Sequence, residues 1–290
     1  MKLSVIIPCF NAAKTIAVQL EALANQEWSE PWEVIISNNG STDESMAIVE
    51  QYRERLPHLR MVDASDKRGA SHARNVGAAV ATGEALAFCD ADDEVAPGWV
   101  AGMGEALSKH DFVAARLEYR KLNEAWLVEG ENKQQETGLI KHDEKPPNLP
   151  YAAGCSLGMK RSIYEAVGKW NEFLLYTEDI EYCWRVQLAG TELHFVPNAV
   201  VHYRLRDNLI DIYRQGHNWA QFYIPLRKKY GEKRSRFTSL KKIVKIGLHM
   251  QMVFLRIHRK AALAGWLWNL GWKIGELKGV VKDLTLDKKD

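Results

Sequence analysis

The chain has 290 residues, of which 46% are hydrophobic and 26% are charged. This composition is that of an ordinary globular protein, and it excludes a disordered chain, a collagen-like repeat and a small disulfide-rich scaffold. Lysine and arginine together number 39 and aspartate and glutamate 37, so the net charge of +2 does not indicate a polyanionic partner such as nucleic acid.

The first hundred residues alternate segments that are typical of strands and of helices. Strand-like apolar runs cover 3–8, 32–37, 60–62 and 85–89, and helical spacing of apolar residues covers 11–25, 41–52 and 70–82. This alternating order predicts an α/β fold with a mostly parallel sheet and helices on both faces. Ligands of such sheets bind beyond the carboxyl ends of the strands, so we expect the polar residues that follow these strands to meet at one edge.

The remaining elements are predicted from weaker patterns. We expect a helix at 97–110, strands within 112–128, a loop at 129–150, helices at 162–167 and 177–188, strands at 193–196 and 199–203, and helices at 208–230 and 240–283. No stretch has the roughly 18 uncharged apolar residues of a membrane span. The N-terminus leads directly into a strand, from which we expect no signal peptide. The four cysteines are far apart and form no metal-binding pattern, so we expect reduced thiols in a cytoplasmic protein.

Three carboxylates in four residues follow the strand predicted at 85–89. On an extended strand end, Asp90 and Asp92 would point the same way, with Asp93 beside them. Acidic groups this close repel one another unless a cation compensates, and Mg²⁺ or Mn²⁺ prefers such oxygen ligands. The alternative is an acidic turn that caps the next helix.

Four segments occur in an order that resembles the inverting glycosyltransferases of family 2. They are Val5–Asn11 (VIIPCFN), Asn38–Asp43 (NNGSTD), the Gly69-x4-Arg74-Asn75-x-Gly77 pattern, and Gly83-Glu84 before Phe88-x-Asp90-Ala91-Asp92-Asp93. The resemblance covers about residues 3–100 and continues more weakly to about 205. It implies a GT-A fold, which is Rossmann-like with a mostly parallel sheet, followed here by a C-terminal helical extension.

The same resemblance implies different functions for different parts of the chain. Residues 1–205 would form the catalytic domain, in which 1–110 bind the nucleotide-sugar and 111–205 bind the acceptor, and 206–290 would form a helical region. The residues implied in donor binding are Pro8, Phe10, Asn11, Asn38, Arg68, Asp90 and Ala91. Those implied in holding Mn²⁺ or Mg²⁺ are Asp90, Asp92 and His202. Such an ion would assist the departure of the nucleoside diphosphate as a Lewis acid. The alternatives are a structural role for His202 and a solvated loop at Lys67 and Arg68.

The second segment departs from the family's pattern. The family usually has Asp-Asp-Gly-Ser where this chain has Asn38-Asn39-Gly40-Ser41. The first carboxylate normally accepts a hydrogen bond from the base, whereas the Asn38 amide can accept through its oxygen and can also donate. A UDP-sugar is therefore the first expectation for the donor, with GDP- and dTDP-sugars as alternatives. Without a binding role, the segment would be a simple turn.

An inverting sugar transfer needs a carboxylate that takes the proton of the acceptor hydroxyl. Thr177-Glu178-Asp179 opens a predicted helix and matches the family's Glu-Asp pair. This implies Asp179 as the general base, with Glu178 as its support or as an acceptor contact. We expect the helix N-terminus to lower the pKa of these carboxylates and keep them ionised. The alternative is that both only stabilise the start of the helix.

Other residues of this half have two interpretations each. For Arg74 the resemblance implies a buried ion pair with the Asp90 cluster, and the alternative is an exposed helix residue. Tyr151–Met159 resembles the family's acceptor-side segment. Trp170 and Tyr176 would either stack on sugar rings or belong to the core.

Beyond residue 226, basic residues gather and three tryptophans follow. They are Arg227, Lys228, Lys229, Lys233, Arg234, Arg236, Lys241, Lys242, Lys245, Arg256, Arg259 and Lys260, then Trp266, Trp268 and Trp272. This combination suits an anionic membrane surface, which would place the protein peripherally on the inner face of the cell membrane. The alternatives are a solvated basic face with tryptophans packed on the catalytic domain, and a helical partner or dimer contact.

These features together predict a metal-dependent inverting glycosyltransferase. It would move a sugar from a nucleotide-sugar to a hydroxyl group in a surface polysaccharide or glycolipid. The acceptor would be a glycan or a lipid-linked molecule. One alternative is a non-catalytic nucleotide-sugar or glycan-binding module. The other is a nucleotidyltransferase, which would favour a glycine-rich basic loop after the first strand. The Gln-x-x-Arg-Trp motif of processive synthases is absent from the sequence, so processive export is not expected.

Overall fold

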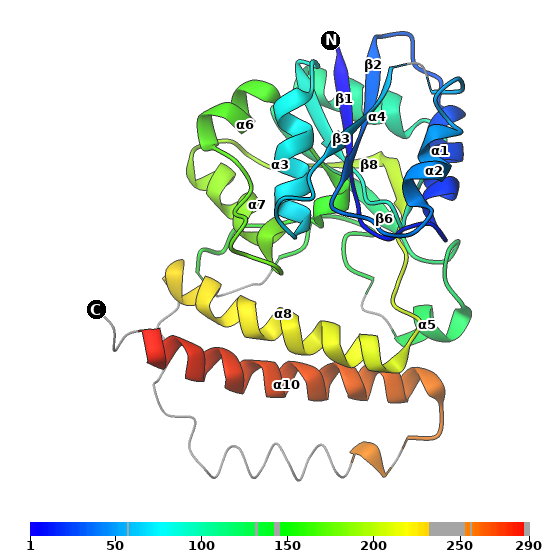
Figure 1. Ribbon diagram of the computed structural model, residues 1–290. Coiled ribbons are helices and arrows are strands. Elements are labelled where there is room, and N and C mark those ends of the chain that lie inside the picture. Colours follow the sequence, from blue (N-terminus) through cyan, green and yellow to red (C-terminus); the bar gives the residue numbers. More distant parts are fainter. Residues whose placement is uncertain (57, 131–132, 142–145, 232–252, 256, 287–290) are drawn as a thin grey trace. The chain divides into compact units, whose positions relative to one another are not determined.

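The computed structural model describes residues 1–56, 58–130, 133–141, 146–231, 253–255 and 257–286 (Figure 1). The chain forms two compact units. The first contains residues 1–122, 134–142 and 149–204, and the second contains 123–133, 143–148 and 205–290.

A sheet with the strand order β3-β2-β1-β4-β7-β6-β8-β5 forms the described core of the first unit. The strands are β1 (Leu3–Cys9), β2 (Trp32–Asn38), β3 (Leu59–Asp63), β4 (Ala85–Phe88), β5 (Glu94–Val95), β6 (Phe112–Glu118), β7 (Leu157–Lys160) and β8 (His194–His202). Strands β1 to β4 run parallel, as predicted. β7 is antiparallel to β4 and β6, β8 is parallel to β6, and β5 is antiparallel to β8.

Helices cover this sheet and follow the predicted order. They are α1 (Ile16–Ala24), α2 (Ser45–Glu50), α3 (Ala70–Val80), α4 (Trp99–Lys109), α6 (Arg161–Val167) and α7 (Glu178–Leu188), with a 3₁₀ turn, η1 (Gly154–Ser156), before β7. β1 is apolar except for Ser4, because it lies between β2 and β4 inside the sheet and is buried on both faces. The two strands predicted near 193–203 are one strand, β8.

Helix α3 approaches the sheet unusually closely through Gly77. A Cβ at this position would lie 2.5 Å from Cγ2 of Ile6 and 2.5 Å from Oγ of Ser37, so only glycine fits without displacement. This contact fixes the height of α3 on β1 and β2. Arg74, one turn earlier on the helix, is thereby held beside the carboxyl ends of the strands.

Two predictions for the second half of the chain are wrong. The strand predicted within 112–128 ends at Glu118, and the helix α5 (Ala125–Gly130) follows in the second unit. The helix predicted at 240–283 is not continuous, because residues 257–259 are not helical and α10 (Lys260–Leu286) begins after them. Residues 240–252 lie outside the described residues.

The second unit is built around α10 and α8 (Leu209–Lys229), which lie side by side (Figure 1). Added Cβ atoms on Gly271 and Gly275 would collide with the carbonyl oxygens of Tyr213 and His217, so glycine permits this close packing. Trp268 and Trp272 pack against aromatic side chains of α8. Within the described residues, no helix is both long enough and apolar enough to cross a membrane.

Candidate active site

The carboxyl ends of β1, β2 and β4 meet at one edge of the sheet. Cys9 pairs with Asn38 in the β1–β2 ladder, and the Asn39 N–H donates to the Cys9 carbonyl at 2.8 Å. The Cys89 N–H donates to the Ile6 carbonyl at 3.3 Å and keeps the segment after β4 beside β1. The predicted convergence of the polar strand ends is therefore present.

The residues proposed to border the nucleotide come together in part. Phe10 is exposed after β1, and the Arg68 guanidinium lies over its ring with Cζ 4.0 Å from the centroid. Asn11 is also exposed, and its Oδ1 accepts from the Thr42 N–H at 2.8 Å. Lys67, by contrast, turns away and donates to Glu172 at 2.8 Å. Phe10 and Arg68 therefore form an aromatic and cationic surface at the edge.

The two asparagines that follow β2 have different roles. Asn38 Oδ1 accepts from the Ser41 N–H at 2.9 Å, which closes the turn. Asn39 is buried, donates from Nδ2 to the carbonyls of Ala64 and Lys67, and accepts from Gly69 N–H. Asn39 thus anchors the loop that carries Arg68, a positioning role that the sequence did not distinguish from that of Asn38.

The acidic segment after β4 is a turn rather than an extended strand end. β4 ends at Phe88, and the Asp93 N–H approaches the Asp90 carbonyl at 3.4 Å. The extended geometry predicted for Asp90 and Asp92 is therefore wrong. Ala91 is buried inside the turn, whereas Asp90 lies partly exposed at the edge.

Gln19 of α1 holds this turn in place. Its Nε2 donates to the Asp90 carbonyl at 3.1 Å, and its Oε1 accepts from the Val95 N–H at 2.9 Å. Gln19 is fully buried and lies on the apolar face that Ile16 and Leu23 define. A polar residue on an apolar helix face was the signal that could have identified it from the sequence.

Asp93 connects the acidic turn to the end of β8. Its Oδ1 accepts from the Arg204 N–H at 2.8 Å, and Arg204 Nε donates to the Asp92 carbonyl at 2.7 Å. Burial, together with the charges of Asp92 and Asp90, raises the pKa of Asp93 well above its ordinary value. The structure therefore adds Asp93 to the acidic group that faces the edge.

His202 lies at the end of β8, two residues before Arg204. Its Nδ1 is 2.8 Å from Oε2 of Glu118, so this ring nitrogen is hydrogen-bonded to Glu118 and not to an aspartate of the turn. Burial acts to raise the pKa of Glu118, but the hydrogen bonds from His202, Arg120 and Lys121 outweigh burial and lower this pKa. An ionised Glu118 fixes which ring nitrogen of His202 carries the proton.

Arg74 links the two acidic groups of the site. Its Nη2 lies 3.0 Å from Oδ1 of Asp90, its Nη1 lies 3.1 Å from Oε1 of Glu178, and its side chain is only 3% exposed. A Cβ on Gly154 would come within 3.0 Å of the guanidinium, so glycine makes room for it. The buried ion pair predicted for Arg74 is present, and the structure extends it to Glu178.

Glu178 and Asp179 begin α7, as predicted. Asp179 Oδ1 accepts a hydrogen bond from the Ile180 N–H at 2.8 Å, and Oδ2 accepts one from the Gly154 N–H at 3.3 Å. Burial and the charge of Asp179 raise the pKa of Glu178 to about 7, against the opposing effect of Arg74. Burial likewise raises the pKa of Asp179. The predicted lowering is therefore wrong, because desolvation outweighs the helix N-terminus.

The aromatic residues near Asp179 differ in how far they are buried. Trp170 is buried, stacks on Tyr182 with centroids 4.4 Å apart, and meets Phe88 edge-on. Trp170 therefore belongs to the core, which is the second of the two interpretations given for it above. Tyr176 is half-buried, and Tyr151 and Cys155 of the acceptor-side segment are buried.

Replacing Arg74 by methionine is expected to lower the free energy of unfolding by about 3–5 kcal/mol, because it leaves two partly buried carboxylates without their cation. Urea unfolding followed by circular dichroism measures this change. Arg53→Met is the matched control, since Arg53 pairs with Glu50 in solvent and should change stability little. An Arg74→Met protein as stable as the Arg53→Met protein would show that the bridge is unimportant.

The geometry at this edge is accompanied by a clear family match. The family described as "Glycosyl transferase family 2" matches residues 4–168. The chain belongs to this family. The family and the class of enzyme predicted from the ordered motifs, a glycosyltransferase, are thereby confirmed.

Individual relatives support the same class. The chain is 38% identical over 143 residues to "Uncharacterized glycosyltransferase YibD" of Escherichia coli, which is 48% of this chain and 41% of that protein. It is 26% identical over 227 residues to the "Poly-beta-1,6-N-acetyl-D-glucosamine synthase" of Staphylococcus epidermidis, covering 76% and 54% of the two chains. The chain thus spans about half the length of these curated relatives.

Solved structures confirm the predicted GT-A fold. The mannosyltransferase PcManGT of Pyrobaculum calidifontis, solved with GDP-Man and Mn²⁺, matches with a TM-score of 0.65 at 18% identity, over 97% of this chain and 86% of that one. S. aureus TarS 1–349, solved with UDP-GlcNAc, matches with a TM-score of 0.57 at 18% identity, over 96% and 91%. At this identity the likeness establishes the fold alone.

Proposed function

We propose that the chain transfers a sugar from a nucleotide-sugar to a hydroxyl acceptor, with inversion at the anomeric carbon. The observation that supports this proposal is the Arg74 bridge, in which one guanidinium contacts Asp90 of the acidic turn and Glu178, the neighbour of the proposed general base. Inversion requires a donor-binding group and a general base around the same reacting centre. The bridge supports this arrangement by joining separate segments, since Arg74 precedes Glu178 by 104 residues in the sequence.

The donor would bind along the edge formed by the ends of β1 and β2. Phe10 and Arg68 offer a ring and a cation to the base and the diphosphate, and Asn11 and Asn38 border the same turn. The related structures contain UDP-GlcNAc and GDP-Man. We keep a UDP-sugar as the first candidate and GDP- or dTDP-sugars as alternatives.

Mn²⁺ or Mg²⁺ would be held by Asp90, Asp92 and His202. A histidine whose Nδ1–H is held by the Glu118 carboxylate presents Nε2 as a ligand, although the ligand atoms of these three residues do not all lie within 4.8 Å of one another in the structure. When bound, the cation would neutralise charge on the departing diphosphate. Arg74 balances one carboxylate of the same group.

Asp179 would take the proton of the acceptor hydroxyl on one of its carboxylate oxygens. The N–H groups of Ile180 and Gly154 orient that carboxylate, and each oxygen keeps a further lone pair for the acceptor. A pKa raised by burial makes Asp179 a stronger base than an exposed carboxylate. Glu178 would keep the pair anchored to Arg74.

The rate of transfer is expected to fall as the pH drops below neutrality. The base acts only when it has lost its proton, and the raised pKa values of the pair, about 7 for Glu178, move this loss to higher pH. A profile of kcat/KM between pH 5 and 9 measures the acid limb. Glu178→Gln removes the neighbouring charge and should move the limb to lower pH. A wild-type profile that stays flat down to pH 5 would contradict this assignment.

A screen of donors tests the proposed function directly. Thermal unfolding is recorded with UDP-, GDP- and dTDP-sugars, each with and without Mn²⁺, because a ligand that binds the folded state raises the melting temperature. We expect one nucleotide class to stabilise the protein only with the cation. Stabilisation by none of them would remove the proposal, and binding without transfer to any glycan acceptor would leave a sugar-nucleotide-binding module.

We further propose that the acceptor is a lipid-linked or surface glycan and that the protein acts in the cytoplasm, against the inner face of the membrane. Phe254 and Leu255 are 50% and 78% exposed, and Arg259 and Lys260 follow a few residues later. Exposed apolar groups beside cations suit an anionic lipid surface. Many of the basic residues noted above, from Lys233 to Lys245 and Arg256, lie outside the described residues.

Flotation with vesicles containing an anionic phospholipid tests this surface. The wild type is expected to float, and the double variant Phe254→Ser/Leu255→Ser should bind at least about tenfold more weakly, because two apolar side chains no longer enter the lipid. Phe173→Ser is the control, since Phe173 is 87% exposed in the other unit. Equal flotation of the wild type and the double variant would exclude the lipid contact.

A further inference from the structure

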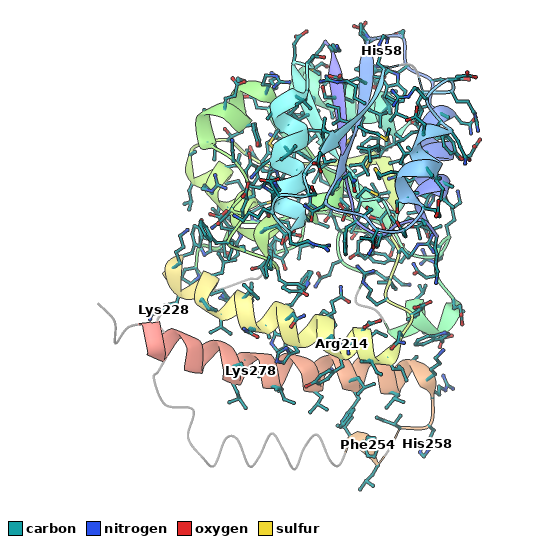
Figure 2. All side chains as sticks on the ribbon, in the orientation of Figure 1. His58, Arg214, Lys228, Phe254, His258 and Lys278 are labelled. Atoms are coloured by element: carbon teal, nitrogen blue, oxygen red, sulfur yellow. The ribbon has the colours of Figure 1, made fainter. Side chains whose placement is uncertain are left out.

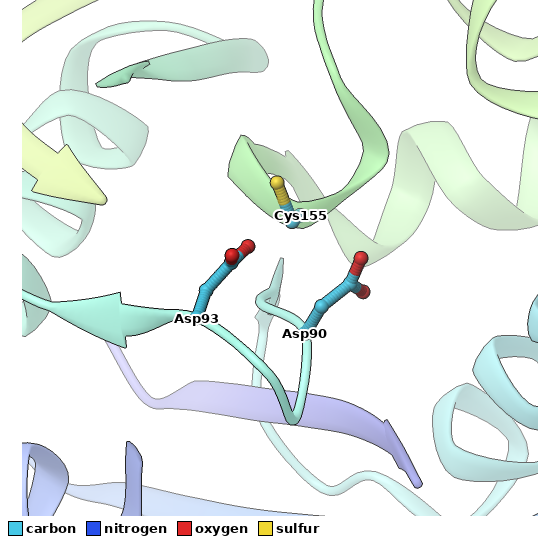
Figure 3. A group of neighbouring side chains, drawn as sticks. All are labelled: Asp90, Asp93 and Cys155. Atoms are coloured by element: carbon cyan, nitrogen blue, oxygen red, sulfur yellow. The ribbon is translucent and has the colours of Figure 1, made fainter. Parts of the chain in front are cut away.

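The side chains of Asp90, Asp93 and Cys155 lie close together at the acidic turn (Figure 3). One ligand atom from each of them lies within 4.8 Å of the other two. Among the described residues, this is the one group of at least three acidic, histidine or cysteine side chains with such spacing. The group differs from the metal ligands proposed above, because it contains a thiol and lacks Asp92.

The topology of the sheet places the thiol there. β7 runs antiparallel to β4, with Gly158 paired to Ala87, so the start of β7 lies beside the end of β4. The 3₁₀ turn η1 precedes β7 and carries Cys155. Two segments more than sixty residues apart, the turn at 90–93 and η1, thereby supply one cluster.

One oxygen of this cluster is buried without a conventional donor. Asp93 is 1% exposed and Cys155 is 2% exposed. Asp93 Oδ1 accepts from the Arg204 N–H, and among the described residues no N–H or O–H donates to Oδ2. The neighbouring Cys155 thiol forms a side-chain hydrogen bond with the Asp93 carboxyl. A buried carboxylate oxygen in this position is costly unless a cation or a donor satisfies it.

We propose that Asp90, Asp93 and Cys155 form a site for a borderline-soft divalent cation such as Zn²⁺, with Cys155 bound as the thiolate. Zn²⁺ lies about 2.3 Å from sulfur and about 2.0–2.2 Å from carboxylate oxygen, so in its tetrahedral geometry two ligand atoms lie about 3.4–3.6 Å apart. Side chains whose ligand atoms lie within 4.8 Å of one another would therefore close by up to about 1 Å around the ion. A thiolate favours Zn²⁺ over Mg²⁺, and water would complete the four ligands.

The charges of the cluster agree with a divalent cation. Three ionised ligands carry three negative charges, while the cation and the Arg74 guanidinium, 3.0 Å from Asp90, carry three positive charges. Both the proton of the Cys155 thiol and the proton of the buried Asp93 carboxyl leave to the buffer when the metal binds. Because Asp90 belongs to this set and to the donor's metal site, bound Zn²⁺ would inhibit sugar transfer. That consequence rests on the proposed function, whereas the binding does not.

The test uses Co²⁺ in place of Zn²⁺ on the full chain, without nucleotide. Thiolate bound to Co²⁺ gives a charge-transfer band in the near ultraviolet, which we expect in the wild type and which Zn²⁺ should abolish by displacement. Cys155→Ser should lose the band. Cys183→Ser is the matched control, since Cys183 is also buried but lies in α7 outside the cluster, and it should keep the band.

Equilibrium dialysis with Zn²⁺ provides the second measurement. We expect one tightly bound ion per chain and at least about tenfold weaker binding in Cys155→Ser and in Asp93→Asn, which keeps the shape of the side chain. Asp93→Asn decides the question if circular dichroism shows that Cys155→Ser is unfolded. The proposal is overturned by a wild type without the band, by a band that survives in Cys155→Ser, or by unchanged Zn²⁺ affinity in folded Asp93→Asn. A failure of sugar transfer alone leaves these results unaffected.

Discussion

Replacing Asp179 by asparagine is expected to reduce sugar transfer by about 10²–10⁴-fold, the usual contribution of a general base. The amide has nearly the same shape but cannot take the proton of an acceptor hydroxyl. One of the two N–H contacts, from Ile180 or Gly154, can still be made to its oxygen. Release of nucleoside diphosphate in the presence of an acceptor measures the rate, and calorimetry measures donor binding, which we expect to persist.

An exposed aspartate of the same unit serves as the control. Asp111 forms an ion pair with Lys160, with 2.7 Å between Oδ1 and Nζ, and among its ion pairs within the described residues it has no contact with Glu178 or Asp179. Asp111→Asn should therefore leave sugar transfer unchanged. If Asp179→Asn transfers sugar at the wild-type rate, the base must be sought elsewhere. Loss of donor binding in Asp179→Asn would instead show that the substitution disturbs the Arg74 bridge.

Replacing Asp92 by alanine is expected to weaken Mn²⁺-dependent binding of the nucleotide by more than about a hundredfold. Loss of a direct metal ligand should exceed the effect of changing a residue behind one, which is about 10–100-fold. Calorimetry of the nucleoside diphosphate with and without Mn²⁺ measures the change. Binding that does not need the cation should be affected far less.

The structure provides a direct competitor for this role. Asp93, rather than Asp92, joins Asp90 in the cluster with Cys155. Asp93→Asn in the same titration therefore decides between the two carboxylates. If Asp92→Ala binds the Mn²⁺–nucleotide normally and Asp93→Asn does not, the assignment of Asp92 from the family's motif is wrong for this chain.

The sequence by itself predicted the sheet, the family and the edge at which the site forms. These features depend on local patterns: short apolar runs form buried parallel strands, helical spacing forms the covering helices, and polar motifs follow the strand ends. Each pattern lies within about ten residues, so it survives without knowledge of the neighbours. The burial of Arg74 was also predicted, but from the resemblance and not from its own surroundings.

Only the tertiary structure decided the geometry and the electrostatics of the site. The turn at Asp90 depends on Gln19 of α1, and the meeting of Asp93 with Cys155 depends on the pairing of β7 with β4. The pKa of Glu178 rises because distant segments exclude water from it, which a helix position alone could not predict. Desolvation and contacts between remote segments are properties of the assembled fold, and a local sequence pattern contains neither.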